Sequence, residues 1–249
     1  MMKVVLWILG AILGLALLYL IIPGFFALFV NPKKEYKKDS KLYRFLLHTA
    51  SGIALWIMRV KVRISGVEKL PKGEKLLFVG NHRSNFDPII TGVVLKEWQI
   101  TFVSKASNFK IPIFGRFIRK CCFMAIDREN PRNALKTIHK AASLLQKGEV
   151  SIGIYPEGTR SKECKLLQFH NGVFKIAQKA NAPIVVLAIS GTEQIHKNYP
   201  LHHTDVYLNV LEVIPADEIK ASKTDALGER IREKMMHKLG EECYAETDC

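Results

Sequence analysis

The chain has 249 residues, of which 48% are apolar, and a formal net charge of +14. This apolar fraction is typical of folded proteins and excludes a chain that is disordered throughout. Residues 1–130 carry +13 of the net charge, so the basic character is concentrated in the N-terminal half. Five cysteines without a Cys-x-x-Cys pair favour reduced intracellular thiols over a disulfide framework or a structural zinc site. We expect one α/β domain of about 200 residues with an N-terminal appendage.

The appendage begins with a long apolar segment. No charged residue lies between Val4 and Val30. As a helix, Val4–Ile22 spans roughly 28 Å, close to the hydrocarbon core of about 30 Å. Pro23 and Gly24 are expected to bend or end this helix. A cleaved signal peptide normally has a shorter apolar region, of about 7–15 residues, so we interpret the segment as a retained membrane anchor.

A basic linker and a second apolar stretch follow. Five lysines between positions 33 and 41 favour an anionic lipid surface on the cytoplasmic side of the cell membrane. Residues 42–60 are predicted to form an amphipathic helix in the membrane interface, with a polar stripe of Arg44, His48, Ser51 and Arg59. A two-helix hairpin in one leaflet and a single span with a surface helix both fit the pattern. Residues 1–60 are therefore interpreted as a two-helix membrane anchor.

From residue 61 to 249, short β-branched runs alternate with amphipathic stretches. Strands are predicted near Val60–Ile64, Leu76–Val79, Ile100–Val103, Phe123–Ile126, Ser151–Tyr155, Ile184–Ile189 and Val206–Val213. Helices are predicted near Pro88–Leu95, Ile113–Lys120, Asn133–Gln146, Gly172–Lys179 and Thr224–Leu239. This alternation indicates an α/β fold, a layered mixed sheet of about seven strands flanked by helices.

A polar loop follows the strand predicted at Leu76–Val79. It contains His82 and, five residues later, Asp87, just before a predicted helix. Functional sites of α/β proteins form at the carboxyl ends of strands. A carboxylate on one imidazole nitrogen fixes the tautomer and leaves the other nitrogen as a base. A packed histidine beside a helix-capping aspartate is the alternative interpretation.

A second polar loop follows the strand predicted at Ser151–Tyr155. Its sequence is Pro-Glu-Gly-Thr-Arg-Ser, at positions 156–161. Proline ends strand pairing, and Gly158 allows a close approach of the backbone. The planar guanidinium of Arg160 suits a phosphate group. An ordinary charged turn is the alternative.

Together, these segments resemble the glycerolipid acyltransferase family, in particular the bacterial 1-acylglycerol-3-phosphate acyltransferases. Residues 81–87 are similar to the first family motif, and residues 155–161 are similar to the third. Similarity to the second and fourth motifs rests on Lys105, Pro112, Gly115, Ala125–Arg128 and Ala182–Val185. Val186 departs from the pattern, because many members have a second proline there.

The resemblance implies transfer of a fatty acyl group from acyl-CoA or acyl carrier protein to the sn-2 hydroxyl of 1-acylglycerol 3-phosphate (lysophosphatidic acid). The product is phosphatidic acid. It further implies that His82 removes the hydroxyl proton and that Asp87 orients His82. The residues implied to hold or shape the phosphate site are Lys105, Arg128, Glu157, Gly158 and Arg160. Thioester attack requires no metal, and we expect neither a metal nor a cofactor.

Other functions compete with this one. Within the class, glycerol 3-phosphate or another lyso-lipid is the alternative acceptor. A membrane-anchored nucleic-acid-binding protein fits the isoelectric point of about 9.6, but the sequence has no nucleic-acid-binding motif, so we expect no nucleic-acid partner. A membrane scaffold with an inactive enzyme fold is disfavoured by the intact His82 and Asp87 pair.

Overall fold

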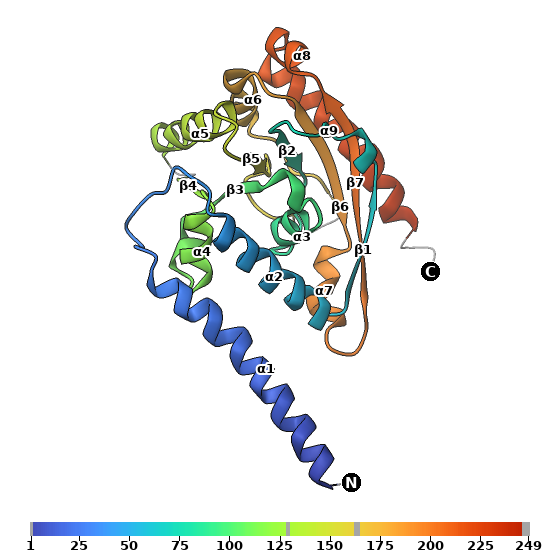
Figure 1. Cartoon of the computed structure of the whole chain (residues 1–249). Coiled ribbons are helices and arrows are strands. Elements are labelled where there is room, and N and C mark those ends of the chain that lie inside the picture. Colours follow the sequence, from blue (N-terminus) through green and yellow to red (C-terminus); the bar gives the residue numbers. More distant parts are fainter. Residues whose placement is uncertain (1, 128–129, 162–164, 246–249) are drawn as a thin grey trace.

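The computed structural model describes residues 2–127, 130–161 and 165–245. Its centre is a seven-stranded mixed sheet in the order β1-β7-β6-β2-β5-β3-β4 (Figure 1). The strands are β1 Val60–Ser65, β2 Leu77–Gly80, β3 Ile100–Lys105, β4 Met124–Ile126, β5 Ser151–Ile154, β6 Ile184–Ser190 and β7 Thr204–Ile214. β6 and β7 are antiparallel, whereas every other neighbouring pair is parallel.

Helices cover both faces of the sheet. The described helices, including α1, which does not cover the sheet, are α1 Met2–Leu28, α2 Lys41–Ile57, α3 Asp87–Val94, α4 Phe114–Lys120, α5 Pro131–Gln146, α6 Lys175–Ala180, α7 Ile195–Asn198, α8 Ala216–Ala221 and α9 Thr224–Ala245. Short 3₁₀ turns join them, at η1 Val67–Lys69, η2 Lys96–Trp98, η3 Ala106–Lys110, η4 Asn171–Phe174 and η5 Thr192–Gln194.

Alternation of side chains along the central strands produces two hydrophobic cores. Val79 and Ile152 point into one core, which is closed by α5, α6 and α9. Phe78 and Val185 point into the other, which is closed by residues of α2, α3 and α7. Because successive side chains of a strand point to opposite faces, a sheet buried on both sides is apolar at every position. The result is a three-layer α/β/α arrangement.

The predicted α/β class with a mixed seven-stranded sheet is confirmed. All seven strands and the five helices predicted after residue 61 occur within a few residues of their expected bounds. Of the two outcomes expected at Pro23, a bend or an end, the end does not occur, because α1 continues through Pro23 to Leu28. α7 and α8 are not predicted, since four and six residues show too little periodicity to be recognised. α6 also has six residues, but η4 directly before it extends the helical stretch over residues 171–180.

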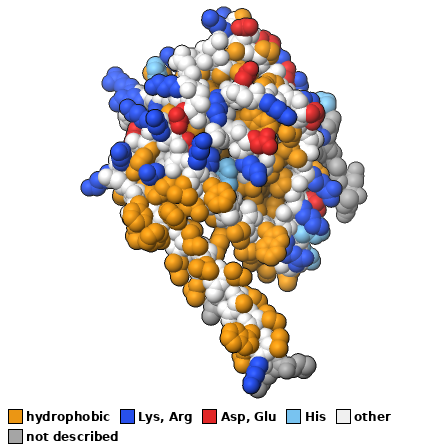
Figure 2. All heavy atoms as spheres, in the orientation of Figure 1, with side chains coloured by type: hydrophobic (Ala, Val, Ile, Leu, Met, Phe, Trp, Pro, Cys, Tyr) orange, Lys and Arg blue, Asp and Glu red, His pale blue; other side chains and the backbone are white. Residues whose placement is uncertain are grey.

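α1 protrudes from the domain with its apolar side chains exposed (Figures 1 and 2). Trp7 is 80% exposed and Leu15 is 67% exposed. Within the described part of the chain, α1 is the one helix long and apolar enough to cross a membrane, although a signal sequence has the same properties. A hydrogen bond of 2.8 Å from the Tyr19 hydroxyl to the Ala50 carbonyl joins α1 to α2.

α2 is amphipathic, and the part of the predicted polar stripe that lies on it, Arg44, His48 and Ser51, faces the protein. Arg44 and Leu55 are buried against the domain. On the outward side, Phe45 is 65% exposed and Trp56 is 78% exposed. The apolar surface of α1 therefore continues onto the adjoining face of the domain (Figure 2). Large exposed apolar patches are typical of membrane or protein contacts.

The Arg44 side chain fastens α2 to the sheet. Its Nε and one terminal nitrogen donate to the two carboxylate oxygens of Asp39, each over 2.7 Å. The other terminal nitrogen donates to the Ile100 carbonyl over 2.8 Å. Further bonds reach the Thr101 hydroxyl at 2.9 Å and the Cys121 carbonyl at 3.2 Å. One buried guanidinium thus links the linker, α2, β3 and α4.

α4 contributes two more cationic contacts to the N-terminal segment. Arg116 donates to the Ala27 carbonyl at the end of α1 over 2.9 Å. The Lys120 ammonium lies 4.5 Å from the centre of the Tyr36 ring and 5.3 Å from that of Tyr43. Cation–π contacts of this length are attractive, so the orientation of the N-terminal segment on the domain is fixed by polar as well as apolar contacts.

The Arg44–Asp39 pair generates a stability prediction. Each side chain is only 6% exposed, so Asp39→Asn leaves a buried guanidinium without its counter-charge. We expect the free energy of unfolding to fall by about 3–5 kcal/mol, measured by urea unfolding of the detergent-solubilised protein. Glu35→Gln is the control, because Glu35 pairs with Lys140 while 71% exposed, and should cost less than about 1 kcal/mol. An equal loss of unfolding free energy in the two variants would contradict the structural role of the Arg44–Asp39 pair, which we call the Arg44 clamp.

Candidate active site

Two loops meet at one edge of the sheet because β2 and β5 are adjacent and parallel. The segments after these strands therefore lie side by side, as expected for carboxyl ends of neighbouring parallel strands. The Ser161 amide donates to the His82 carbonyl over 2.8 Å and ties the loops together. The Asn81 side chain exchanges two hydrogen bonds of 2.8 Å with the backbone of Ile189 and joins the first loop to β6.

His82 and Asp87 are in direct contact. The His82 Nδ1 lies 2.7 Å from Asp87 Oδ2, and this oxygen also accepts the amides of Arg83 and Ser84 over 2.7 Å each. A carboxylate can only accept hydrogen bonds, so Nδ1 carries the proton and Nε2 is left as the basic nitrogen. Asp87 is fully buried, whereas the His82 side chain is 16% exposed. The aspartate therefore orders its own loop and orients the histidine at once.

Two further residues support this pair and were missed from the sequence. The Thr192 hydroxyl, at the end of β6, donates to Asp87 Oδ1 over 2.6 Å. The ring of Tyr155 stacks on His82 with centroids 4.5 Å apart and planes at 16°, and Phe102 stacks on Tyr155 in turn. The sequence signal for Thr192 is only that it follows the strand predicted at Ile184–Ile189. Its place beside Asp87 depends on the pairing of β6 with β2, which are parallel and end at the same edge of the sheet.

Glu157 supports the backbone of the first loop. Its side chain is nearly buried, and Oε1 accepts the His82 amide over 2.7 Å while Oε2 accepts the Leu167 amide over 2.9 Å. Burial raises the pKa of Glu157, and the two amide donors oppose that shift. Its carboxylate therefore positions His82 through the backbone and does not line the cavity that contains the imidazole.

That cavity has a volume of about 480 Å³ and combines a base, cations and apolar walls. Four of the residues proposed for the site line it, namely His82, Lys105, Gly158 and Arg160. Apolar side chains of α2, α3 and β3 form much of the remaining wall. Arg128 falls outside the described residues. Among the residues that are described, no group of three or more His, Cys, Asp or Glu side chains gathers to hold a metal ion.

Glycine is favoured at position 158 by both the backbone conformation and the space around it. Its φ is +68°, a conformation that side-chain-bearing residues rarely adopt. A Cβ at this position would also lie 3.0 Å from Cδ2 of His170. The positive φ of Gly158 lets the loop after β5 approach the loop after β2 closely. The sequence predicted such a close approach of the backbone at Gly158.

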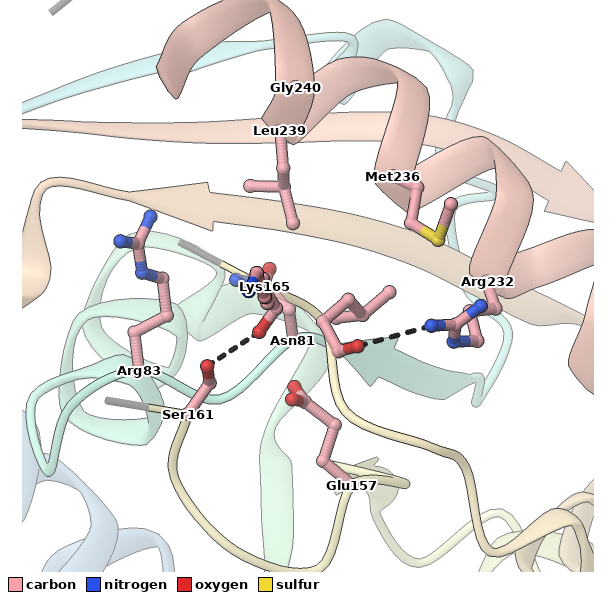
Figure 3. Close-up of a pocket in the computed structure, with 10 residues that line it drawn as sticks. Asn81, Arg83, Glu157, Ser161, Lys165, Arg232, Met236, Leu239 and Gly240 are labelled. Carbon is pink, nitrogen blue, oxygen red and sulfur yellow. Dashed lines mark hydrogen bonds between the residues drawn. The ribbon is translucent and has the colours of Figure 1, made fainter. Parts of the chain in front are cut away.

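A second cavity, of about 360 Å³, lies between the two loops and α9 (Figure 3). Arg232 and Leu239 reach it from α9, and Arg83 and Glu157 reach it from the loops. The Arg232 guanidinium donates to the Leu166 carbonyl over 3.2 Å. The His82 side chain lines the cavity of about 480 Å³ and not this second cavity. The His82–Asp87 pair can therefore act only on a molecule bound in the larger of the two.

Comparison with known proteins places the chain in a family. Residues 61–190 match the family described as Acyltransferase. The chain is 33% identical to the 1-acyl-sn-glycerol-3-phosphate acyltransferase of Bacillus subtilis over 204 residues, which cover 77% of this chain and 96% of the relative. The chain therefore belongs to the acyltransferase family.

Other similarities agree with this assignment. The chloroplastic 1-acyl-sn-glycerol-3-phosphate acyltransferase BAT2 of Brassica napus is 31% identical over 203 residues, covering 80% of this chain and 56% of the relative. The chain thus spans about half the length of such plant relatives. The crystal structure of the 1-acyl-sn-glycerophosphate (LPA) acyltransferase PlsC from Thermotoga maritima has the same fold, with a TM-score of 0.70, 24% identity and coverage of 92% and 91%.

The raised pKa of Glu157 predicts a pH-dependent contribution to stability. Between the ordinary value of 4.5 and the raised value, the folded protein keeps a proton that the unfolded chain has lost. The stabilisation by Glu157 is therefore complete below pH 4.5 and decreases as the pH rises. Relative to Glu157→Gln, the wild type should lose free energy of unfolding as the pH rises, measured by urea unfolding at several pH values. A wild-type advantage that grows with pH would contradict this.

Proposed function

We propose that the chain transfers a fatty acyl group from an acyl thioester to the sn-2 hydroxyl of 1-acylglycerol 3-phosphate, giving phosphatidic acid for phospholipid biosynthesis. The observation that carries the proposal is one cavity in which the oriented base His82 lies with Lys105 and Arg160. The activity for which the Bacillus subtilis and Brassica napus relatives are named supports it.

The proposed chemistry needs one base and no covalent enzyme intermediate. Nε2 of His82 takes the proton of the acceptor hydroxyl as its oxygen attacks the thioester carbonyl. A carbon–oxygen bond forms, the carbon–sulfur bond breaks, and the imidazolium returns the proton to the leaving thiolate. Asp87 stabilises the imidazolium, because its carboxylate already accepts the Nδ1 proton over 2.7 Å.

Lys105 and Arg160 are proposed to bind the acceptor phosphate, together with Arg128. A guanidinium can bind two phosphate oxygens at once, and an ammonium adds a point charge. Gly158 shapes the phosphate site by the turn of its loop, and Glu157 contributes by holding the backbone of His82. No cofactor takes part in the proposed reaction.

The membrane provides the apolar substrates in this proposal. Residues 1–60 form the anchor and residues 61–249 the acyltransferase domain, on the cytoplasmic side where lysines 33–41 meet anionic lipid. α1 supplies an apolar helix of membrane-spanning length, and α2 turns its apolar side outward. The acyl chain of lysophosphatidic acid can then stay in lipid while the headgroup enters the cavity.

The proposal is tested by acyl transfer with purified protein in lipid vesicles. Lysophosphatidic acid, glycerol 3-phosphate and a lyso-aminolipid are each combined with acyl-CoA and with acyl carrier protein as donor. We expect the highest kcat/KM with lysophosphatidic acid. A higher kcat/KM with either other acceptor would contradict the proposed acceptor, whichever donor is used.

The assignment of His82 as the base predicts the results of two substitutions. His82→Ala should abolish transfer, because it removes the imidazole that Asp87 orients toward the cavity. Asp87→Asn should reduce kcat by about 10⁴, by analogy with the serine-protease triad, since the imidazole loses its oriented tautomer. A radiolabelled acyl-transfer assay measures both. Near-normal turnover by His82→Ala would exclude His82 as the base.

The proposed phosphate site predicts a substitution that weakens binding of the acceptor but not of the donor. Arg160→Ala should raise the KM for lysophosphatidic acid strongly and leave the donor KM almost unchanged. Loss of one partner of a charge pair shielded from water weakens binding by roughly 2–5 kcal/mol. Lys110→Ala is the control, because Lys110 is exposed on neighbouring η3 and does not line the cavity. A defect in donor KM instead would place Arg160 on the carrier and not on the acceptor.

A further inference from the structure

The polar stripe of α2 contains side chains that the proposed reaction does not use. Arg44 is held in its clamp; Arg59, predicted on the same stripe, lies beyond the end of α2 at Ile57 and donates to the Leu201 carbonyl over 3.0 Å. The two polar side chains between them, His48 and Ser51, line the cavity that contains His82. The helix that carries the exposed apolar face therefore also forms a wall of the candidate active site.

His48 presents unused hydrogen-bonding atoms to that cavity. Its side chain is half-buried, and among the described residues it has no hydrogen-bond partner. Burial, together with the positive charge of Arg44, lowers the pKa of His48 to about 4. The imidazole is consequently neutral near pH 7, with one N–H donor and one acceptor nitrogen.

The place of α2 determines which part of a substrate His48 can meet. In the proposed function, the phosphate lies at Lys105 and Arg160 and the reacting hydroxyl lies at His82. The acyl chain leaves the cavity toward lipid, past the helix whose outward side exposes Phe45 and Trp56. Between the glycerol and that chain, lysophosphatidic acid has one polar group, its sn-1 ester.

We propose that His48 donates a hydrogen bond to the carbonyl oxygen of the sn-1 ester of the acceptor and so helps select a monoacylated acceptor. Glycerol 3-phosphate has no carbonyl there and cannot accept this bond. The assignment rests on the proposed function, since it assumes the phosphate and hydroxyl positions given above. His48 is thus a specificity-determining residue supplied by the N-terminal segment.

The test compares two acceptors that differ only in this carbonyl. These are 1-acylglycerol 3-phosphate and its 1-O-alkyl analogue, with equal chain lengths and the same donor. Wild type should prefer the ester by about 3- to 10-fold in kcat/KM, the usual worth of one hydrogen bond. His48→Leu should reduce this preference to about 1 and keep the wild-type kcat/KM on the ether. His48→Gln, which retains an N–H donor, should keep part of the preference.

Controls separate this contact from folding and from the proposed function. Thr49→Ala is the matched variant, because Thr49 is exposed on the same helix and should leave the preference unchanged. Equal loss on ester and ether in His48→Leu would overturn the proposal and indicate a structural role or a donor contact. Absence of an ester preference in active wild type would also overturn it. Wild type inactive on both acceptors would instead contradict the proposed function itself.

Discussion

A carboxylate without solvent contact has to find donors for its oxygens, and the candidate site is arranged around one such group, Asp87. Its oxygens accept from the His82 ring, from the amides of Arg83 and Ser84, and from the Thr192 hydroxyl. These donors come from the loop after β2 and from the turn after β6. Because fully satisfied buried networks are rigid, this carboxylate fixes both the loop and the imidazole plane. The buried Glu157 carboxylate fixes the His82 backbone in the same way, by accepting its amide hydrogen bond.

A second constraint acts on the N-terminal segment. An amphipathic helix on a soluble protein turns its apolar side to the core, but α2 turns Arg44 inward and Phe45 and Trp56 outward. Burial of Arg44 is tolerated because Asp39 and three further oxygens bind it. The clamp therefore holds an outward apolar surface in a fixed place beside the cavity. The proposed lipid substrates need such a surface, since their chains stay in the membrane.

Local patterns were enough to predict the sheet and the main helices, because short β-branched runs and period-3.6 apolar spacing are visible along the chain. The five-residue separation of His82 and Asp87 left a packed histidine beside a capping aspartate as the alternative, and the resemblance of residues 81–87 and 155–161 to family motifs favoured the pair. The support of that pair was not predictable in the same way. Thr192 is 105 positions from Asp87, and only the parallel pairing of β6 with β2 brings it close. The Glu157 carboxylate was expected at the phosphate site, but its orientation depends on amides from two separate segments. Likewise, the stripe on α2 shows amphipathicity but not which side faces the domain.

The central claim is that the cavity beside His82 joins a thioester acyl group to the sn-2 hydroxyl of lysophosphatidic acid. The most direct measurement supplies an isotopically labelled acyl thioester to wild-type protein in vesicles with unlabelled 1-acylglycerol 3-phosphate, and locates the label by positional mass spectrometry. The account predicts labelled phosphatidic acid with the label at sn-2 and release of one free thiol per product. Label recovered as free fatty acid, or on any other position or lipid, would contradict it.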